Sequence, residues 1–422
     1  MDQPVGETGD PTERPARSRL MLLLGLALLA RLIVAAVSIG SNDAILFHTF
    51  AVEIRKFGVI ETYQLDGLFN HPPLVALWAR AALLFADRLP QPFGEVHAFC
   101  FIFKLPIIAA DVLGAWLIWK IWRRKLGSKA AGAIAAAAAW SLCGIAISAY
   151  HCNTDPLYAA LCLAAVYLME ERESYFLGGL TLAAAINVKI VPVLLIPGLL
   201  LSCRSPDQAR KFFLGLAIGA APFLPVLAKA APSFAHNALA YNSSVNNWGV
   251  TVLLVLRQLF QGNFGATSVA VDRYHDVGRY VLFALIGGWA VLARVRNLWT
   301  RYEIAVVSLS LFLIFTPGFG IQYLAMVGLL LFACHPRIAT LYAVSAGAFA
   351  AALYLTALHR GEFPFLSNLE RYHVAEAFLG VIPWAVLVCF VAATLRRAVN
   401  RSTERSLTGQ PMAGSYTSAR AA

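Results

Sequence analysis

The sequence predicts an all-α polytopic membrane protein with about twelve transmembrane helices and two long external loops. Hydrophobic residues make up 59% of the 422 positions and charged residues only 14%, whereas soluble domains have about 45–50% apolar and about 25% charged residues. Apolar runs about 20 residues long recur along the chain, and such runs match the thickness of the bilayer core, which a helix crosses with its backbone hydrogen bonds satisfied. These runs lack the alternation of a transmembrane barrel. A water-soluble multidomain enzyme is therefore excluded.

The first expected helix runs from Leu20 to Ile39 and follows a polar stretch, 1–19, which we interpret as a disordered cytoplasmic tail. No small-x-small cleavage site follows the apolar run, which favours an uncleaved helix over a signal peptide. The apolar piece from Leu74 to Phe85 is short for a span and carries Arg80, so we expect an interfacial helix there. The other spans are expected at 98–121, 130–149, 156–169, 175–188, 190–203, 211–228, 280–294, 302–316, 321–334, 338–357 and 373–395.

The distribution of basic residues sets the orientation of these spans. If the segment 74–85 does not cross the membrane, the basic clusters lie on the same side as both termini, as the positive-inside rule requires of a cytoplasmic face. The net charge of +11 then reflects the basic residues of the cytoplasmic loops, and no nucleic-acid partner is expected. The chain divides into one membrane domain, 20–395, with external loops at 40–97 and 229–279, and a cytoplasmic tail, 396–422. The clusters are Arg123, Arg124, Lys125 and Lys129; Arg204, Arg210 and Lys211; Arg294, Arg296 and Arg301; Arg337; and Arg396, Arg397 and Arg401.

Asp43 stands in the motif Ser41-Asn42-Asp43, directly after the first span. A carboxylate at the membrane boundary, shielded from bulk water, can accept a proton from a hydroxyl group. Its position before an apolar stretch is also typical of a helix start. Asp43 is therefore either a catalytic base or part of a helix cap.

His71 lies in the motif Asn70-His71-Pro72-Pro73-Leu74 of the same loop. Two prolines fix the backbone before a helix start and would hold His71 rigidly for substrate binding. A plain turn that leads into a helix explains the motif equally well.

A polar turn, His151 to Pro156, joins two apolar spans and contains Asn153 and Asp155. Polar side chains at membrane depth are costly and tend to face a cavity. These residues are candidates for substrate binding, and the alternative is an interfacial cap.

Lys189 lies inside a run that is otherwise apolar, close to Pro192 and Pro197. A lysine there must extend to the interface, pair with an acid or bind an anion, and the prolines indicate that the helix is broken nearby. A lysine at the mouth of a cavity could bind phosphate, whereas a lysine that only extends to the interface would have no such role.

Aromatic and amide side chains that suit sugar binding occur later, in the second long loop and in the turn after Pro317. Tryptophan and tyrosine also gather at membrane interfaces without any catalytic role. The seven cysteines show neither CxxC spacing nor clustering with histidine, so neither a zinc site nor a disulfide framework is expected. The candidate substrate-binding residues in this part of the chain are Tyr241, Asn247, Trp248, Gln322 and Tyr323.

Taken in order, these features resemble the GT-C superfamily of membrane glycosyltransferases that use polyprenyl-phosphate sugars. The resemblance covers residues 20–335 and departs from the family pattern after Asp43, where Ala44 and Ile45 stand in place of a second acid. The motifs that carry it are Asp43 with Phe47 to Phe50, Tyr63 with Asn70 to Leu74, Asp111, the turn His151 to Asp155, Lys189 with Pro192, Asn246 to Trp248, and Pro317 to Tyr323.

The resemblance implies an inverting glycosyltransferase in which Asp43 is the general base and Lys189 and His151 bind the donor phosphate. A hexose, with mannose favoured, would pass from a polyprenyl-phosphate sugar to a lipid-linked or glycan acceptor on the external face. No cofactor and no obligatory metal are implied, although Asp43 and Asp155 leave room for a divalent cation. High alanine content and a preference for arginine over lysine suit a bacterial cytoplasmic (inner) membrane.

A transporter or lipid flippase is the competing class, since it also needs about twelve helices and a few buried polar groups. That class predicts polar residues near the midplane of the membrane and a path that opens to both sides in turn. The candidate residues here gather on one side, which favours the enzyme.

Overall fold

The computed structural model describes residues 13–89, 94–239, 248–254, 265–359 and 374–408, and every regular element among them is a helix. The predicted all-helical class is confirmed. Within these residues six helices are long and apolar enough to cross a membrane: Arg14–Val37, Glu95–Ala139, Pro206–Ala238, Val269–Arg296, Pro336–Leu355 and Leu379–Arg397. Together they identify an integral membrane protein.

Shorter helices coincide with the other expected spans. At a rise of 1.5 Å per residue, none of them alone covers the roughly 30 Å of a bilayer core, so the count of twelve spans stays a prediction. These helices are α7 (Asp155–Glu170), α8 (Tyr175–Val188), α9 (Ile196–Leu201), α14 (Arg301–Phe315) and α15 (Ala325–Cys334).

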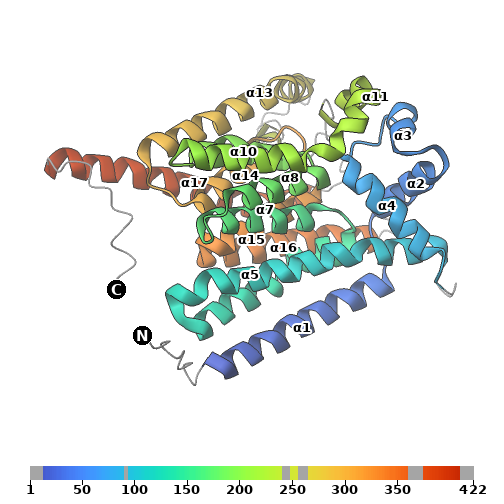
Figure 1. The fold of residues 1–422 in the computed structure, drawn as a ribbon, viewed down its shortest axis with the longest axis horizontal. Helices are drawn as coiled ribbons and strands as arrows, with labels where there is room; N and C mark the ends of the chain where they lie inside the picture. The colour runs from blue at the N-terminus through green and yellow to red at the C-terminus, as the bar shows by residue number, and fades with distance from the viewer. Residues whose placement is uncertain (1–12, 90–93, 240–247, 255–264, 360–373, 409–422) are drawn as a thin grey trace, which may run out of the picture.

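Helices α1 (Glu13–Val37) and α5 (Glu95–Ala139) lie side by side along one edge of the molecule (Figure 1). Gly127, with φ of 75°, breaks α5 into two parts, which match two predicted spans. A fully buried ion pair joins the helices, with Nη2 of Arg31 donating to Oδ2 of Asp111 at 2.7 Å. Ser148 donates to the same oxygen at 3.3 Å. Pairing offsets the high cost of these charges in an apolar environment.

The first external segment folds into three helices, α2 (Asn42–Phe57), α3 (Val59–Leu65) and α4 (Pro73–Ala86). They gather at one end of the molecule, beside α11 (Leu224–Phe234) (Figure 1). Helix α4 forms over the stretch predicted as an interfacial helix and begins at the second proline of the double-proline motif. Its position relative to a membrane stays a prediction.

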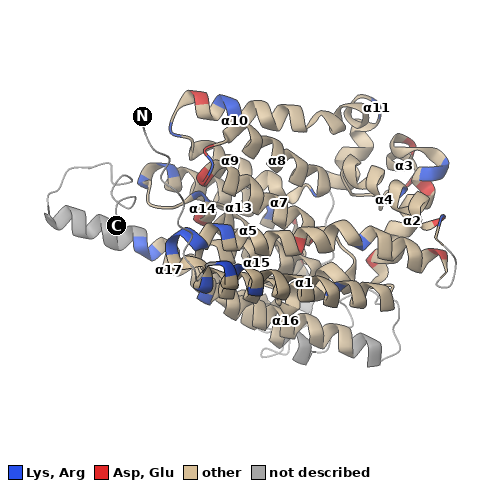
Figure 2. Cartoon of the chain, turned by 60° about the horizontal axis from the view of Figure 1, so that its bottom comes forward, with Lys and Arg blue, Asp and Glu red and all other residues tan. Residues whose placement is uncertain are grey.

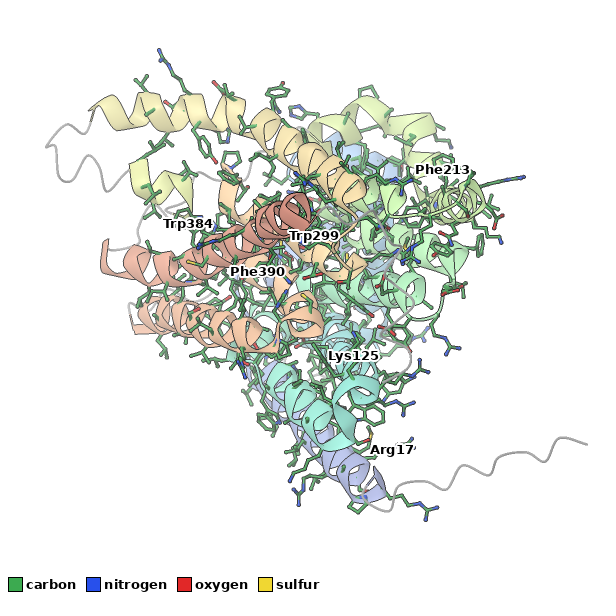
Figure 3. The ribbon with its side chains drawn as sticks, turned by 90° about the vertical axis from the view of Figure 1, so that its left-hand side faces the viewer. Arg17, Lys125, Phe213, Trp299, Trp384 and Phe390 are labelled. Carbon is green, nitrogen blue, oxygen red and sulfur yellow. The ribbon has the colours of Figure 1, made fainter. Side chains whose placement is uncertain are left out.

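Basic residues gather at the opposite end, where α1 begins (Figure 2). In the view onto that end, Arg17 of α1 lies near the lower edge and Lys125 of α5 lies above it (Figure 3). This distribution agrees with a cytoplasmic end that carries the positive charge.

Three predicted boundaries were wrong. Helix α1 begins at Glu13, so residues 13–19 are helical rather than disordered. Helix α17 (Val374–Thr408) continues well beyond 395, into the predicted tail. Helix α13 (Gly265–Arg296) begins fifteen residues before the expected span at 280. Hydropathy marks the apolar part of a helix and misses its polar extensions.

The remaining elements are α6 (Leu142–Ile145), η1 (Ala146–His151), η2 (Val191–Leu195), α10 (Pro206–Gly219), η3 (Ala221–Phe223), η4 (Ala235–Leu239), η5 (Ile321–Leu324) and α16 (Pro336–His359).

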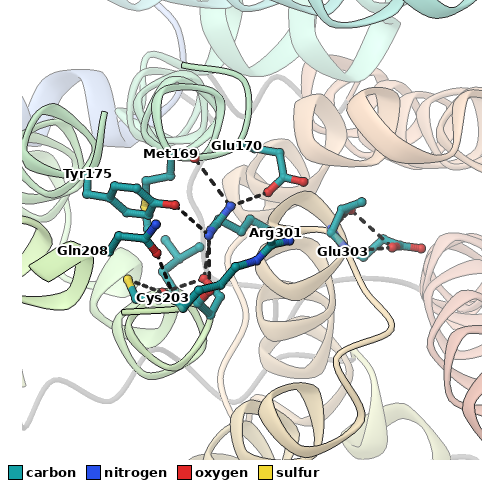
Figure 4. Close-up of polar contacts among 11 residues, drawn as sticks. Met169, Glu170, Tyr175, Cys203, Gln208, Arg301 and Glu303 are labelled. Carbon is teal, nitrogen blue, oxygen red and sulfur yellow. Dashed lines mark hydrogen bonds and ion pairs between the residues drawn. The ribbon is translucent and has the colours of Figure 1, made fainter. Parts of the chain in front are cut away.

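Arg301 holds several helices together near the basic end (Figure 4). Its guanidinium donates to Glu170 of α7 at 2.8 Å, to the hydroxyl of Tyr175 of α8 at 3.2 Å and to the side chain of Ser202, after α9, at 3.1 Å. Glu303 completes a capping box with Thr300 at the start of α14. Because α14 ends at Phe315, this cluster fixes a helix whose other end reaches the cavity described below.

Candidate active site

A cavity of about 600 Å³ lies where α2, the loop before α4, α13 and the turns after α8 and α14 meet. Polar groups from distant parts of the chain converge on its wall, and apolar side chains such as Phe47 and Leu282 line the rest. Such a mixture is typical of a ligand site. The polar residues on the wall are Asp43, Asn70, His71, Asn153, Lys189, His275, Arg279, Tyr280, Thr316, Gln322 and Tyr323.

Asp43 is held by the start of α2 and by the polar turn after η1. The Ser41 hydroxyl accepts a hydrogen bond from the backbone N–H of Asp43 at 3.2 Å and donates to the carbonyl of His151 at 2.8 Å. Nδ2 of Asn153 donates to Oδ2 of Asp43 at 2.6 Å, and Nε2 of His151 lies 3.1 Å from the same oxygen. Asp43 stands in the first turn of α2, where Ser41 is the N-cap, and it also faces the cavity, while its role as catalytic base stays a prediction.

The pKa of Asp43 is lowered to about 2. Burial alone would raise this pKa, but the hydrogen bond and electrostatic interaction with His151, the hydrogen bond from Asn153 and the charge of Lys189 together outweigh it. Asp43 is therefore a carboxylate at physiological pH.

His151 lies behind Asp43 and does not line the cavity. It is the last residue of η1, a π-helical turn, and it is fully buried. Turns of this kind are frequent at functional sites. Its Nε2 points to Asp43 rather than to the cavity, and the expectation that His151 binds the donor phosphate stays a prediction.

Gly40 allows the backbone after α1 to approach this turn. It has a φ of +117°, and a Cβ added here would collide with the carbonyl oxygen of Tyr150. We expect Gly40→Ala to lower the free energy of unfolding by about 1–3 kcal/mol and to displace Asp43. A matched control is Gly25→Ala within α1, where an added Cβ meets nothing within 4 Å and the change should be neutral or stabilising by at most about 1 kcal/mol. Thermal unfolding in detergent would measure both, and equal stability of the two variants would contradict the assignment.

Lys189 stands at the other side of the cavity, where α8 ends in extended backbone just before η2. Its Nζ donates to Oδ2 of Asp155 at 2.5 Å and lies 4.8 Å from the centre of the Tyr323 ring. The structure therefore shows Lys189 paired with an acid at the cavity wall. The side of its ammonium group that faces the cavity is available to an anion.

Asp155 is fully buried and supports Lys189 from behind. Its other carboxylate oxygen accepts a hydrogen bond from the hydroxyl of Tyr158 at 3.0 Å. Asp155 does not line the cavity, and its expected contact with substrate stays a prediction. Because Lys189 and Tyr158 occupy its two oxygens, Asp155 would have to exchange partners in order to hold a divalent cation.

His71 projects into the cavity from the loop before α4. Its ring packs on Phe47 with centroids 4.6 Å apart, and its carbonyl accepts a hydrogen bond from the Tyr63 hydroxyl at 2.5 Å. Burial and the charge of Lys189 lower the pKa of His71 to about 3, against the opposing charge of Asp43. His71 is consequently a neutral donor or acceptor.

The later candidates divide between the cavity and the protein core. Gln322 and Tyr323 of η5 line the cavity. Trp248 does not, because it is buried, stacks on Phe319 with centroids 4.2 Å apart and donates to the carbonyl of Leu313 at 2.8 Å. Trp248 therefore packs the core, and its expected contact with substrate stays a prediction. Tyr241 and Asn247 lie outside the described residues.

Two cavity residues, His275 and Arg279, were missed by the sequence analysis. They reach the wall because α13 continues beyond its apolar part. Arg279 is exposed, and no acidic partner is found for it among the described residues. A sequence signal was present, since an arginine in a loop assigned to the external side runs against the positive-inside trend.

Comparison with known families gives one match. The model of Glycosyltransferase family 87 matches residues 99–319, a stretch that includes Asn153, Lys189 and Arg279 and begins after Asp43 and His71. No curated protein matches the chain.

Proposed function

Since the chain belongs to glycosyltransferase family 87, a GT-C-type family of polytopic membrane glycosyltransferases, we propose that it is an inverting hexosyltransferase. The proposed donor is a polyprenyl-phosphate sugar, with mannose favoured, and the acceptor is a lipid-linked or glycan hydroxyl. One observation carries the proposal: a single cavity is lined by an ionised carboxylate, Asp43, and by two cations, Lys189 and Arg279.

Asp43 is proposed as the general base. Its Oδ2 already accepts hydrogen bonds from His151 and Asn153, which leaves Oδ1 for the proton of the acceptor hydroxyl. As that O–H bond breaks, the acceptor oxygen bonds to the anomeric carbon, and the bond from this carbon to the phosphate oxygen breaks with its electron pair. The proton ends on Asp43, and the negative charge ends on the lipid phosphate. Proton transfer of this kind contributes about 10² to 10⁴ in rate.

Lys189 alone cannot neutralise the negative charge that develops on the leaving phosphate. Its positive charge is already compensated by Asp155, so the pair adds little net charge to the cavity. Arg279 supplies a further positive charge on the same wall. A leaving dianion is stabilised by preorganised cations, and we assign this role to Lys189 and Arg279 together.

Arg279→Gln is expected to raise the KM for the lipid-phosphate donor by about tenfold, because one charge-assisted contact to phosphate is lost. The KM for the acceptor should stay the same. Arg273→Gln provides the control, since Arg273 is exposed on the same helix but does not line the cavity. Initial rates at varied donor concentration would measure both, and a wild-type donor KM in Arg279→Gln would remove this residue from the phosphate site.

The external location of the reaction is supported by the charge distribution. Lys and Arg gather at the end where α1 begins (Figure 2), and α2 to α4, which carry Asp43 and adjoin the cavity, lie at the other end (Figure 1). With the basic end in the cytoplasm, the cavity faces outward from a bacterial inner membrane and both termini are cytoplasmic.

A transporter would need ionisable groups near the midplane that face a solvent path. The buried polar cluster on α1, α5 and η1, made of Arg31, Asp111 and Ser148, is internally paired and does not line the cavity. This pairing supports the enzyme over the transporter.

The test is transfer of labelled mannose or glucose from a polyprenyl phosphate to a membrane acceptor extract by the purified protein. We expect a radiolabelled product with one donor, and none with the corresponding nucleotide sugar. Product formed only from the nucleotide sugar would overturn the proposed donor class.

A further inference from the structure

A third residue stands behind the Asp43–His151 pair. The hydroxyl of Tyr354, on α16, lies 2.8 Å from Nδ1 of His151, and Nε2 of His151 lies 3.1 Å from Oδ2 of Asp43. Tyr354 and His151 are both buried. The three side chains form a continuous row from the core to the cavity, although 203 residues separate Tyr354 from His151.

Hydrogen-bond chemistry gives this row a direction. A neutral imidazole has one N–H donor and one bare nitrogen acceptor, and an ionised carboxylate can only accept. The nitrogen beside Asp43 must therefore carry the hydrogen, which makes Nδ1 the acceptor for the Tyr354 hydroxyl. With the other tautomer, a lone pair would face the carboxylate.

We propose that Tyr354 is a positioning residue that fixes the orientation of the His151 ring and thereby holds Asp43 as an oriented base. This inference rests on the proposed function of Asp43 as the general base. Tyr354 does not line the cavity, so it acts only through His151.

The ring of Tyr354 is held in place independently of its hydroxyl. It packs against Tyr150, with ring centroids 4.9 Å apart, and against the ring of His151 at 5.8 Å. A Tyr354→Phe substitution therefore keeps these packing contacts and removes the hydrogen bond to Nδ1. Nδ1 of His151 then loses the hydrogen bond that fixes the angle of the ring, and Nε2 is held less well on the line to Oδ2 of Asp43.

The chain offers a matched control on the same helix. Tyr342 is also buried in α16, and its hydroxyl donates to the carbonyl of Leu324 at 2.9 Å. Tyr342→Phe deletes one buried hydrogen bond, as Tyr354→Phe does, but leaves His151 untouched. Any effect of hydroxyl loss on general stability should appear in both variants.

The experiment combines kinetics with nitrogen NMR of the full-length protein labelled with ¹⁵N-histidine. The resonances of His151 are assigned by their loss in His151→Gln. We expect the hydrogen to stay on Nε2 in both proteins, and the Nδ1 resonance to move in Tyr354→Phe to the position of a nitrogen that accepts no hydrogen bond. We also expect kcat to fall about tenfold, the equivalent of one hydrogen bond, with the donor KM unchanged. Tyr342→Phe should show neither effect.

Two results would overturn the proposal: a Tyr354→Phe protein with wild-type Nδ1 resonance and kcat, or equal losses of kcat in the Tyr354 and Tyr342 variants. The NMR readout also separates this inference from the proposed function. If the Nδ1 resonance moves as expected while the wild-type protein transfers no sugar from any polyprenyl phosphate, the sugar-transfer proposal fails and the link from Tyr354 to His151 stands.

Discussion

Asp43→Asn is expected to lower kcat by about 10² to 10⁴ while the protein stays folded. The amide has nearly the same shape as the carboxylate, and its oxygen still accepts hydrogen bonds from His151 and Asn153 at the position of Oδ2. It cannot take the proton of an acceptor hydroxyl. Donor binding should change little, because the phosphate is assigned to Lys189 and Arg279 on other parts of the wall.

Single-turnover rates with saturating donor and acceptor would measure this loss, with Asp87→Asn as the control. Asp87 forms a surface pair with Arg55 at the same end of the molecule and does not line the cavity. If Asp43→Asn keeps wild-type turnover on an accepted substrate, another group is the base.

The pKa of about 2 for Asp43 also predicts how activity depends on pH. Asp43 loses its charge only as pH falls through about 2, so between pH 8 and pH 5 its ionisation should cause no loss of activity.

Lys189→Met is expected to cost both stability and activity. Removing the lysine leaves the fully buried carboxylate of Asp155 without its ion-pair partner, and breaking a buried pair in this way costs about 3–5 kcal/mol. The loss of the cation should also reduce kcat by about 10² to 10³, the effect of removing one preorganised stabilising group. Unfolding in mixed micelles and initial-rate kinetics would measure the two effects.

The double variant Asp155→Asn, Lys189→Met separates these effects. Neutralising both partners removes the unpaired charge, so most of the lost stability should return. Activity should not return, because the leaving phosphate still lacks Lys189. Full recovery of kcat in the double variant would show that the lysine is only a structural partner of Asp155.

The positions of most helices and the general location of the site could be predicted from sequence. Apolar runs report burial in lipid directly, which is why the expected spans coincide with helices. The convergence of Asp43 and Lys189 on one cavity followed from their expected sidedness, although 146 positions separate them in the chain. The side of the membrane on which a residue is expected limits the candidate site residues to one end of a membrane protein.

Sequence could not distinguish residues that face the cavity from residues directly behind them. His151 and Asn153 belong to one polar turn, yet only Asn153 reaches the open space. The direction of each side chain depends on a π-helical turn and on the left-handed backbone of Cys152, at a φ of 66°, and neither has a clear local signature. Tyr354 was missed because it lies within an apolar run, where an aromatic residue ordinarily only packs.

The buried pair of Arg31 and Asp111 has a consequence for biogenesis. Helix α1 emerges from the ribosome 80 residues before its acidic partner on α5, so the translocon must first accept a helix with an uncompensated arginine at a cost of about 2.5–3.5 kcal/mol. The strong hydropathy of the rest of α1 can offset this cost. Once α5 is inserted, Asp111 neutralises the guanidinium of Arg31. This ion pair gives α1 and α5 a specific attraction within the lipid before the later helices are inserted.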